Sequence, residues 1–261
     1  MITKTDAPAT RSIQLEVEVP GTPEQVWQAI ATGPGITAWF TPTEVTERKG
    51  GAISFHLGPG MDSTGVVTSW EPPRRFAYEE RDWQPGAPPL ATEFLIEARA
   101  GGLSMVRLVS SLFTSSADWD DQLESFEISW PPFLYVRRLY LEYFPGQRCS
   151  TILVTGEAPA PEARAWAALT AALGLSGLAM GERRTATVAG APALAGIVER
   201  VSGRELVLRT TEPAPGVALI GAYTFGDQAP AVVARDEPAW RAWMAARFPS
   251  VEASSETGAM A

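Results

Sequence analysis

The stretch that decides the fold is residues 13–30, IQLEVEVPGTPEQVWQAI. Residues 13–19 alternate apolar and polar side chains, a pattern that predicts a half-buried strand. Thr22 is a natural N-cap, Pro23 suits the first helical position, and the apolar spacing of residues 26–30 predicts a helix. A second stretch, residues 151–169 (TILVTGEAPAPEARAWAAL), repeats the order of strand, Pro-rich turn, Pro-Glu pair and helix with a Trp. The chain is therefore predicted to hold two domains of one architecture.

The rest of the first half alternates between strand-like runs and turn residues. The predicted strands cover residues 44–47, 52–57, 63–70, 75–81, 90–98 and 104–113. Helical character returns from Asp118, and a long helix is predicted to open near Trp130. Pro131 and Pro132 lack backbone donors and therefore fit the start of a helix better than its interior. This helix runs to Pro145-Gly146, a clear stop signal.

The second half is predicted to be a shorter copy with less sheet. Its predicted helices cover residues 161–173 and 239–248, and its predicted strands cover residues 182–188, 195–201, 205–211, 217–225 and 231–234. Further matches keep the same order, for example GVVT at residues 65–68 with GIVE at residues 196–199. We therefore expect one domain at residues 11–146, a degenerate copy at 147–250, and disordered tails at 1–10 and 251–261.

Composition and charge exclude several classes of function. The 261 residues carry a formal net charge of -9 and no basic stripe, so a nucleic-acid partner is not expected. No apolar run approaches the ~20 residues needed to span a bilayer, so membrane insertion is not expected. The single cysteine, Cys149, fits a reducing compartment, and the polar first ten residues lack the apolar core of a signal peptide. Frequent Arg and Ala indicate GC-rich coding, and we expect a cytoplasmic, bacterial protein.

The first half resembles the SRPBCC superfamily of START-like, helix-grip proteins, and within it the branch named after the activator of the heat-shock chaperone ATPase. The resemblance rests on residues 20–27, Trp39-Phe40, residues 65–76 (GVVTSWEPPRRF) and residues 129–134 (SWPPFL), and it covers residues 11–146. It implies an α+β fold in which an antiparallel sheet wraps around one long C-terminal helix, here in tandem duplication. The gap between sheet and helix is then a typical site for an apolar ligand.

Residues with obvious catalytic chemistry are scarce. His56 is the only histidine, so a His-rich metal site is impossible, and we expect no catalytic residue, metal or cofactor. The acidic residues between 118 and 124 are interpreted as a complement to the helix dipole. Aromatic residues are better candidates, because in this fold some of them must line the gap. Arg107 and Arg137 are candidate polar contacts there, although a surface position is favoured for an arginine. The predicted ligand-binding residues are Trp39, Phe40, Phe55, Trp70, Tyr78, Phe94, Trp130, Phe133 and Arg137.

These observations favour a non-enzymatic tandem protein that binds a small hydrophobic or aromatic molecule in its first domain. Two alternatives stay open. One is an enzyme similar to the polyketide cyclases and aromatases of the superfamily, in which polar groups assist proton transfer. The other is a chaperone-associated interaction module, which a large exposed apolar patch would favour. Buried polar residues converging on an open cavity would favour the enzyme, whereas an enclosed, purely apolar cavity would favour the binder.

Overall fold

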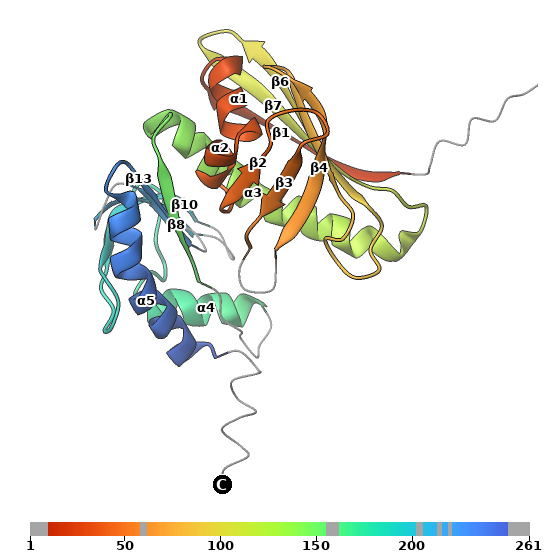
Figure 1. The fold of residues 1–261 in the computed structure, drawn as a ribbon. Helices are drawn as coiled ribbons and strands as arrows, with labels where there is room; N and C mark the ends of the chain where they lie inside the picture. Colours follow the sequence, from red (N-terminus) through yellow and green to blue (C-terminus); the bar gives the residue numbers. More distant parts are fainter. Residues whose placement is uncertain are drawn as a thin grey trace, which may run out of the picture. The chain divides into compact units, whose positions relative to one another are not determined.

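The computed structural model describes residues 10–57, 62–154, 162–201, 206–212, 216–218 and 221–249. The chain divides into two compact units, Met1–Gly146 and Gln147–Ala261, each with its own antiparallel sheet (Figure 1). The tails expected to be disordered lie outside the described residues, apart from Thr10. Among the described helices, none combines the length and the apolar character that crossing a membrane requires.

The first unit is an α+β domain with a seven-stranded sheet. Its strands are β1 (Arg11–Pro20), β2 (Thr43–Val45), β3 (Ala52–Phe55), β4 (Ser63–Glu71), β5 (Arg75–Glu80), β6 (Leu90–Arg99) and β7 (Leu103–Leu112). Its helices are α1 (Pro23–Ala31), α2 (Gly33–Thr37) and α3 (Asp120–Tyr143), with a 3-10 turn at Ala117–Trp119. The strand order is β1-β7-β6-β5-β4-β3-β2, so the first strand pairs with the last. The strands predicted from sequence are confirmed, with small shifts at their ends.

The turn from β1 into α1 follows from its sequence. Gly21 has a φ of 111°, a conformation open to glycine, and it lets the chain leave the strand sharply. Thr22 is the N-cap of a capping box. Its hydroxyl accepts a hydrogen bond from the backbone N–H of Gln25, and the Gln25 side chain accepts one from the backbone N–H of Thr22. Pro23 occupies the first turn, where its missing donor costs nothing. The predicted strand, turn and helix start are therefore confirmed.

The long helix α3 corrects one expectation from the sequence. It begins at Asp120 and runs through Pro131 and Pro132 without ending, rather than opening near Trp130. Each proline removes the donor for the carbonyl four residues earlier, which is that of Glu127 and that of Ile128. Both of these residues are exposed, so water can hydrate the carbonyls that the prolines leave without a partner.

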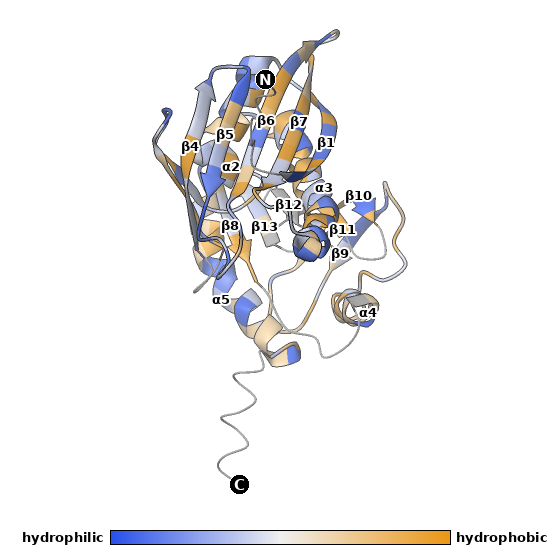
Figure 2. Ribbon diagram, turned by 90° about the vertical axis from the view of Figure 1, so that its right-hand side faces the viewer, coloured by the Kyte–Doolittle hydropathy of each residue, from blue (hydrophilic) through white to orange (hydrophobic). Residues whose placement is uncertain are grey.

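One face of this sheet forms the core of the unit. Hydrophobic and hydrophilic residues alternate along its strands (Figure 2), most regularly in β7, where every second residue is buried. The buried residues of α3 include Leu134, Leu139 and Leu141, and α3 packs against β1 while α1 packs against β6. A large antiparallel sheet with a long helix after its last strand is the helix-grip fold that the sequence predicted.

The second unit has a six-stranded sheet and two helices. Its strands are β8 (Cys149–Leu153), β9 (Arg183–Ala186), β10 (Leu194–Val201), β11 (Leu206–Glu212), β12 (Gly216–Ala218) and β13 (Gly221–Phe225). Its helices are α4 (Glu162–Ala172) and α5 (Ala229–Arg247). The strand order is β8-β13-β12-β11-β10-β9, so here too the first strand pairs with the last and the others follow in reverse.

Two predictions for the second unit are wrong. Residues 217–225 do not form one strand, because β12 ends at Ala218 and β13 begins at Gly221, and the two strands pair antiparallel. Residues 231–234 belong to α5 rather than to a strand, since Pro238 lies inside that helix instead of opening it. Pro238 has no N–H to donate to the carbonyl of Ala234, and Ala234 is exposed, so water can hydrate that carbonyl.

The Trp27→Ala substitution tests the packing of α1 on the sheet. Trp27 is only 4% exposed, and its ring centroid lies 5.0 Å from that of Trp70 and 6.3 Å from that of Phe76. Removing the ring leaves a large cavity, so we expect a loss of about 3–5 kcal/mol in the free energy of unfolding of the first unit. Urea titration followed by amide NMR signals of that unit measures it. The control is Ile128→Ala at a half-exposed position, with an expected change within about 0.5 kcal/mol. A loss under about 1 kcal/mol for Trp27→Ala would contradict the packing.

Candidate ligand-binding site

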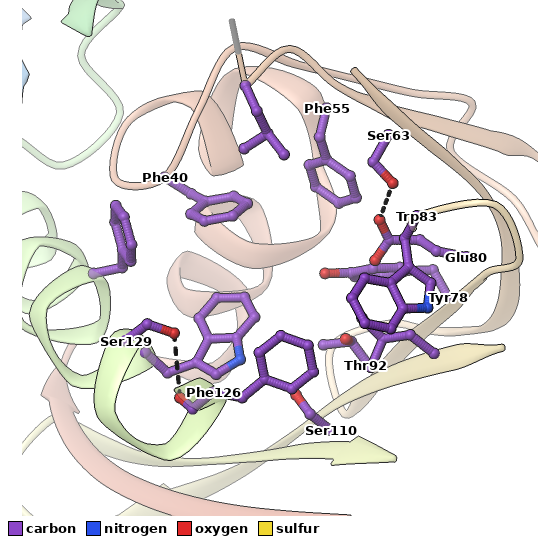
Figure 3. A pocket seen from close by; sticks show the side chains of 14 residues that line it. Phe40, Phe55, Ser63, Tyr78, Glu80, Trp83, Thr92, Ser110, Phe126 and Ser129 are labelled. Carbon is purple, nitrogen blue, oxygen red and sulfur yellow. Dashed lines mark hydrogen bonds between the residues drawn. The ribbon is translucent and has the colours of Figure 1, made fainter. Parts of the chain in front are cut away.

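A cavity of about 190 Å³ lies in the first unit between the inner face of the sheet and α3 (Figure 3). The residues that line it are Phe40, Phe55, Leu57, Ser63, Tyr78, Glu80, Trp83, Leu90, Thr92, Ser110, Phe126, Ser129, Trp130 and Phe133. A cavity of roughly 150 Å³ can hold benzene. This cavity therefore has room for one aromatic ring with a short side chain.

One wall of the cavity is aromatic and centres on Phe40, which follows α2. The Phe40 ring centroid lies 5.8 Å from that of Phe55 on β3, 5.4 Å from that of Trp130 and 5.1 Å from that of Phe133. Trp130 and Phe133 lie three residues apart on α3, so they share one face of the helix. Edge-to-face and tilted contacts of this kind suit an additional aromatic ring.

A second aromatic group closes another side of the cavity. Trp83, in the loop after β5, lies 5.8 Å from Phe126 of α3 and 6.1 Å from Trp119, between ring centroids. Its indole N–H donates a hydrogen bond of 2.9 Å to the carbonyl of Pro88, which ties the loop to itself. The loop of residues 82–89 is thus fixed across the cavity by an aromatic cluster.

The opposite wall is a row of buried polar groups on the inner face of the sheet. Tyr78 pairs with Thr92, and Thr92 pairs with Ser110, so these three lie side by side on β5, β6 and β7. Glu80 lies one inward position beyond Tyr78 and accepts a hydrogen bond from the Ser63 hydroxyl of β4 (Figure 3). All five side chains are buried. A ligand between the two walls would contact rings on one side and hydrogen-bonding groups on the other.

The polar row contains groups in unusual states. Burial raises the pKa of the Glu80 carboxyl above its ordinary value, and the hydrogen bond from Ser63 only partly opposes this. Burial also raises the pKa of the Tyr78 phenol, and the neighbouring Glu80 charge adds to it. The Ser110 hydroxyl has no hydrogen-bond partner among the described residues. Buried polar groups are normally paired, so an unpaired hydroxyl that lines a cavity is available to a ligand.

Arg137 lies one helical turn beyond Phe133, outside the residues that line the cavity. Its side chain is fully buried, and its guanidinium carbon lies 5.4 Å from the ring centroid of Trp39 and 6.0 Å from that of Phe94. In the part of the chain that the structure describes, its three guanidinium nitrogens have no hydrogen-bond acceptor. Burial lowers the pKa of this guanidinium to about 9, so it remains charged at neutral pH.

The predicted site residues divide into three groups. Those that line the cavity are Phe40, Phe55, Tyr78, Trp130 and Phe133. Trp39, Phe94 and Arg137 lie together in the layer beside it. Trp70 packs against Trp27 and Phe76, away from the lining residues.

Two further polar candidates lie outside the cavity. Arg107 lies on the surface, as the sequence favours: its guanidinium donates to Glu16 at 2.8 Å on the outer side of β7, where alternation places every odd-numbered residue. His56 is also outside the lining, and its half-exposed imidazole lies 3.2 Å from the Asp62 carboxylate.

Sequence reasoning missed the polar row. Ser63, Glu80, Thr92 and Ser110 lie within predicted strands, and none of them is among the predicted ligand-binding residues. A signal was present in the period of two: Phe76 and Tyr78 face inward, so Glu80 must follow them onto the same face. Thr92 stands in the same relation to the inward Leu90 and Phe94 on β6.

Residues 20–134 match the model of a family described as activator of Hsp90 ATPase homolog 1-like protein. The matched residues lie within the first unit and make up most of it. A comparison with curated proteins found no match. Among solved structures, CalU16 from Micromonospora echinospora is similar at 20% identity over 52% of this chain and 78% of its own, with a TM-score of 0.44. Protein MLL2253 from Mesorhizobium loti is similar at 19% identity over 51% of this chain and 98% of its own, with a TM-score of 0.47.

A third similar structure is the Aha1 dimer from Colwellia psychrerythraea, at 20% identity over 52% of this chain and 99% of its own, with a TM-score of 0.41. Each of the three structures thus corresponds to about half of this chain. All the residues that line the cavity lie within residues 20–134, which the family model matches.

Glu80→Gln tests the state of the buried carboxyl. Because the folded pKa is raised above the unfolded one, the folded state binds more protons between the two values. Wild-type stability should therefore fall as the pH rises from about 4.5 through the raised pKa, and Glu80→Gln should lack this loss. The free energy of unfolding of the variant relative to wild type should increase with pH between 4.5 and 8, in urea titrations. Glu79→Gln, on the outer face, is the matched control, and a pH-independent difference for Glu80→Gln would contradict the assignment.

Proposed function

We propose that the first unit binds a small aromatic or hydrophobic molecule with a hydrogen-bonding group, in the cavity between the sheet and α3. The observation that carries this proposal is the opposition of its two walls. Aromatic rings around Phe40 face buried polar side chains of the sheet, and one of these, Ser110, has an unpaired hydroxyl among the described residues. Cavities with mostly aromatic walls and a few placed polar groups are typical small-molecule sites.

A catalytic role is the second candidate, because the interior is not purely apolar. Glu80 is a buried carboxyl whose pKa is raised by burial, beside the Tyr78 phenol at the cavity wall. A carboxyl held closer to its neutral form can act as a general acid near neutral pH. If the domain catalyses a reaction of a cyclase type, Glu80→Gln should retain a ligand of different mass from the wild type, as measured by native mass spectrometry of protein from the same host.

The chaperone-associated alternative rests on the description of the family, which names an activator of the Hsp90 ATPase. A direct test is whether the full chain changes the ATPase rate of Hsp90 from the same host. The cavity proposal does not depend on the outcome, since it is tested by titrating a small molecule in the absence of any chaperone.

We further propose that the second unit is a shorter copy of the first. Both sheets pair the first strand with the last and continue in reverse order, and in both units a long helix follows the last strand. The sequence repeat at the start of each unit supports the same conclusion. An experimental structure in which residues 147–249 do not superpose on residues 11–146, strand for strand, would reject the duplication. We also expect the first unit to hold the larger cavity.

The cavity proposal predicts which side chains govern affinity. The neutral probe 3-phenylpropionamide has one ring and a short polar chain, which suits the volume of the cavity. We expect Trp130→Ala and Phe133→Ala to weaken its binding by roughly 10-fold each, because both remove apolar contact area from the aromatic wall. His56→Ala is the control and should bind as the wild type does. NMR titration measures all four affinities, after each protein has been shown to be folded.

The NMR chemical-shift changes show where the probe binds. Amide signals of Thr92 and Ser110 should move on addition of the probe. If His56→Ala abolished binding while both aromatic variants resembled wild type, the binding site would lie elsewhere and the cavity proposal would be rejected.

A further inference from the structure

We propose that Arg137 is an anion-binding group next to the inner end of the cavity, and that the ligand is an acid. Its aromatic or hydrophobic body would occupy the cavity, and a carboxylate or similar anion would pair with the guanidinium. This inference rests on the proposed function of the cavity and adds the chemical class of the ligand.

The first observation is a buried charge without a counter-ion. The Arg137 side chain has no exposed surface, and none of its guanidinium nitrogens finds an acceptor among the described residues. Taking an ion out of water without pairing it is costly, and buried charges in proteins are normally paired or hydrogen-bonded. An arginine kept in such a place by the fold therefore indicates an anion that arrives from outside the chain.

The rings around Arg137 hold the cation but do not replace that anion. Trp39 and Phe94 lie within cation–π distance of the guanidinium carbon, at 5.4 Å and 6.0 Å. The indole N–H of Trp39 donates to the carbonyl of Ala29 at 2.8 Å, so this ring is fixed in position. Aromatic faces attract the charge, yet they accept none of the five N–H bonds in the plane of the guanidinium. A carboxylate would accept two of them at once.

The helix places Arg137 in line with the cavity. Trp130, Phe133 and Arg137 are spaced by three and four residues on α3, so they follow one another along one face. The first two line the cavity, and the third is one turn further along. An elongated ligand lying along α3 would thus meet the two rings first and the guanidinium next.

The register of β6 also places Arg137 close to the polar row of the cavity. Phe94, beside the guanidinium, is two residues from Thr92 on β6 and faces the same way. Successive inward positions on a strand are roughly 7 Å apart. Arg137 is therefore about one side-chain row away from the polar row of the cavity. A ring carrying a chain of two or three carbons spans that distance.

Phe40 is the side chain that separates the two places. Its ring contacts Phe133 at 5.1 Å on the cavity side and Trp39 at 5.9 Å on the side of Arg137, between centroids. An acidic ligand would have to displace this ring to reach the guanidinium. Glu80, the acidic residue of the cavity lining, is hydrogen-bonded to Ser63 instead of to Arg137. The guanidinium is left for the ligand.

The experiment compares 3-phenylpropionate with its amide, 3-phenylpropionamide, on the full chain by NMR titration. The two probes have nearly the same shape and differ in charge. In the wild type we expect the acid to bind roughly 10- to 100-fold more tightly than the amide, the range for a hydrogen-bonded charge. Arg137→Met should remove that advantage while leaving the affinity for the amide within about 3-fold. Arg137→Lys should retain part of it.

Arg138→Met is the matched control. Arg138 is the adjacent residue, half-exposed, and its nearest carboxylate is that of Glu142 at 4.0 Å. The preference for the acid should survive in this variant, whereas non-specific attraction of anions to the helix surface would be reduced by either substitution.

Each outcome supports or rejects the inference. If the amide binds in the cavity and the acid binds no more tightly in wild type, the role of Arg137 is rejected and the cavity proposal stands. If Arg137→Met weakens both probes equally, the residue is structural and the inference is again rejected. If neither probe binds the wild type, both proposals fail for this class of ligand. Should Arg137→Met not fold, the acid–amide ratio in wild type and in Arg137→Lys decides alone.

Discussion

The contact between α3 and the inner face of the sheet is the interaction on which the rest of the first unit depends. Because β1 pairs with β7, and α3 follows β7, the last helix must cross the face that the strands leave uncovered. Where α3 carries Leu134, Leu139 and Leu141, it fills that face with aliphatic side chains. Where it carries Phe126, Trp130 and Phe133, flat rings meet other rings and leave about 190 Å³ between helix and sheet. The cavity is thus a consequence of which side chains stand along one helix.

The interior of the first unit holds two ionisable side chains that packing alone does not require. Glu80 and Arg137 are both buried, and neither forms an ion pair among the described residues. Burial disfavours the charged form of each, so it raises the pKa of Glu80 and lowers that of Arg137 to about 9. The arginine nevertheless stays protonated at neutral pH, because its ordinary pKa is so high. Groups that cost stability without compensation are expected at functional sites.

The framework of the first unit could be predicted from sequence because its signals are local. Alternation in strands, the capping box at Thr22 and the Gly-rich turns each act over a few residues. The path of α3 could not, since Pro131 and Pro132 normally end a helix, and only tertiary packing and exposed carbonyls at Glu127 and Ile128 let it continue.

The site was predicted in part for a related reason. Composition identifies aromatic residues as candidates, and five of those named do line the cavity. The polar row needs the register between strands, which places Tyr78, Thr92 and Ser110 side by side, and a single sequence does not state that register. The burial of Arg137 is likewise a tertiary fact, because an arginine on a helix is exposed in most proteins.

The second unit pairs its strands in a similar order but packs different side chains against its last helix. The helix after its last strand, α5, carries Trp240 and Trp243, both buried, and they form a core cluster with Ile152 of β8. In the first unit the helix after the last strand, α3, carries Phe133 and Arg137, beside a cavity. Strand pairing depends on backbone hydrogen bonds and tolerates such exchanges, whereas the space between helix and sheet depends on every side chain that faces it. If the two units arose by duplication, the second could fill its interior with two indoles and keep its fold. In the first unit, by contrast, the unpaired Ser110 hydroxyl lines a cavity and the unpaired Arg137 guanidinium lies beside it.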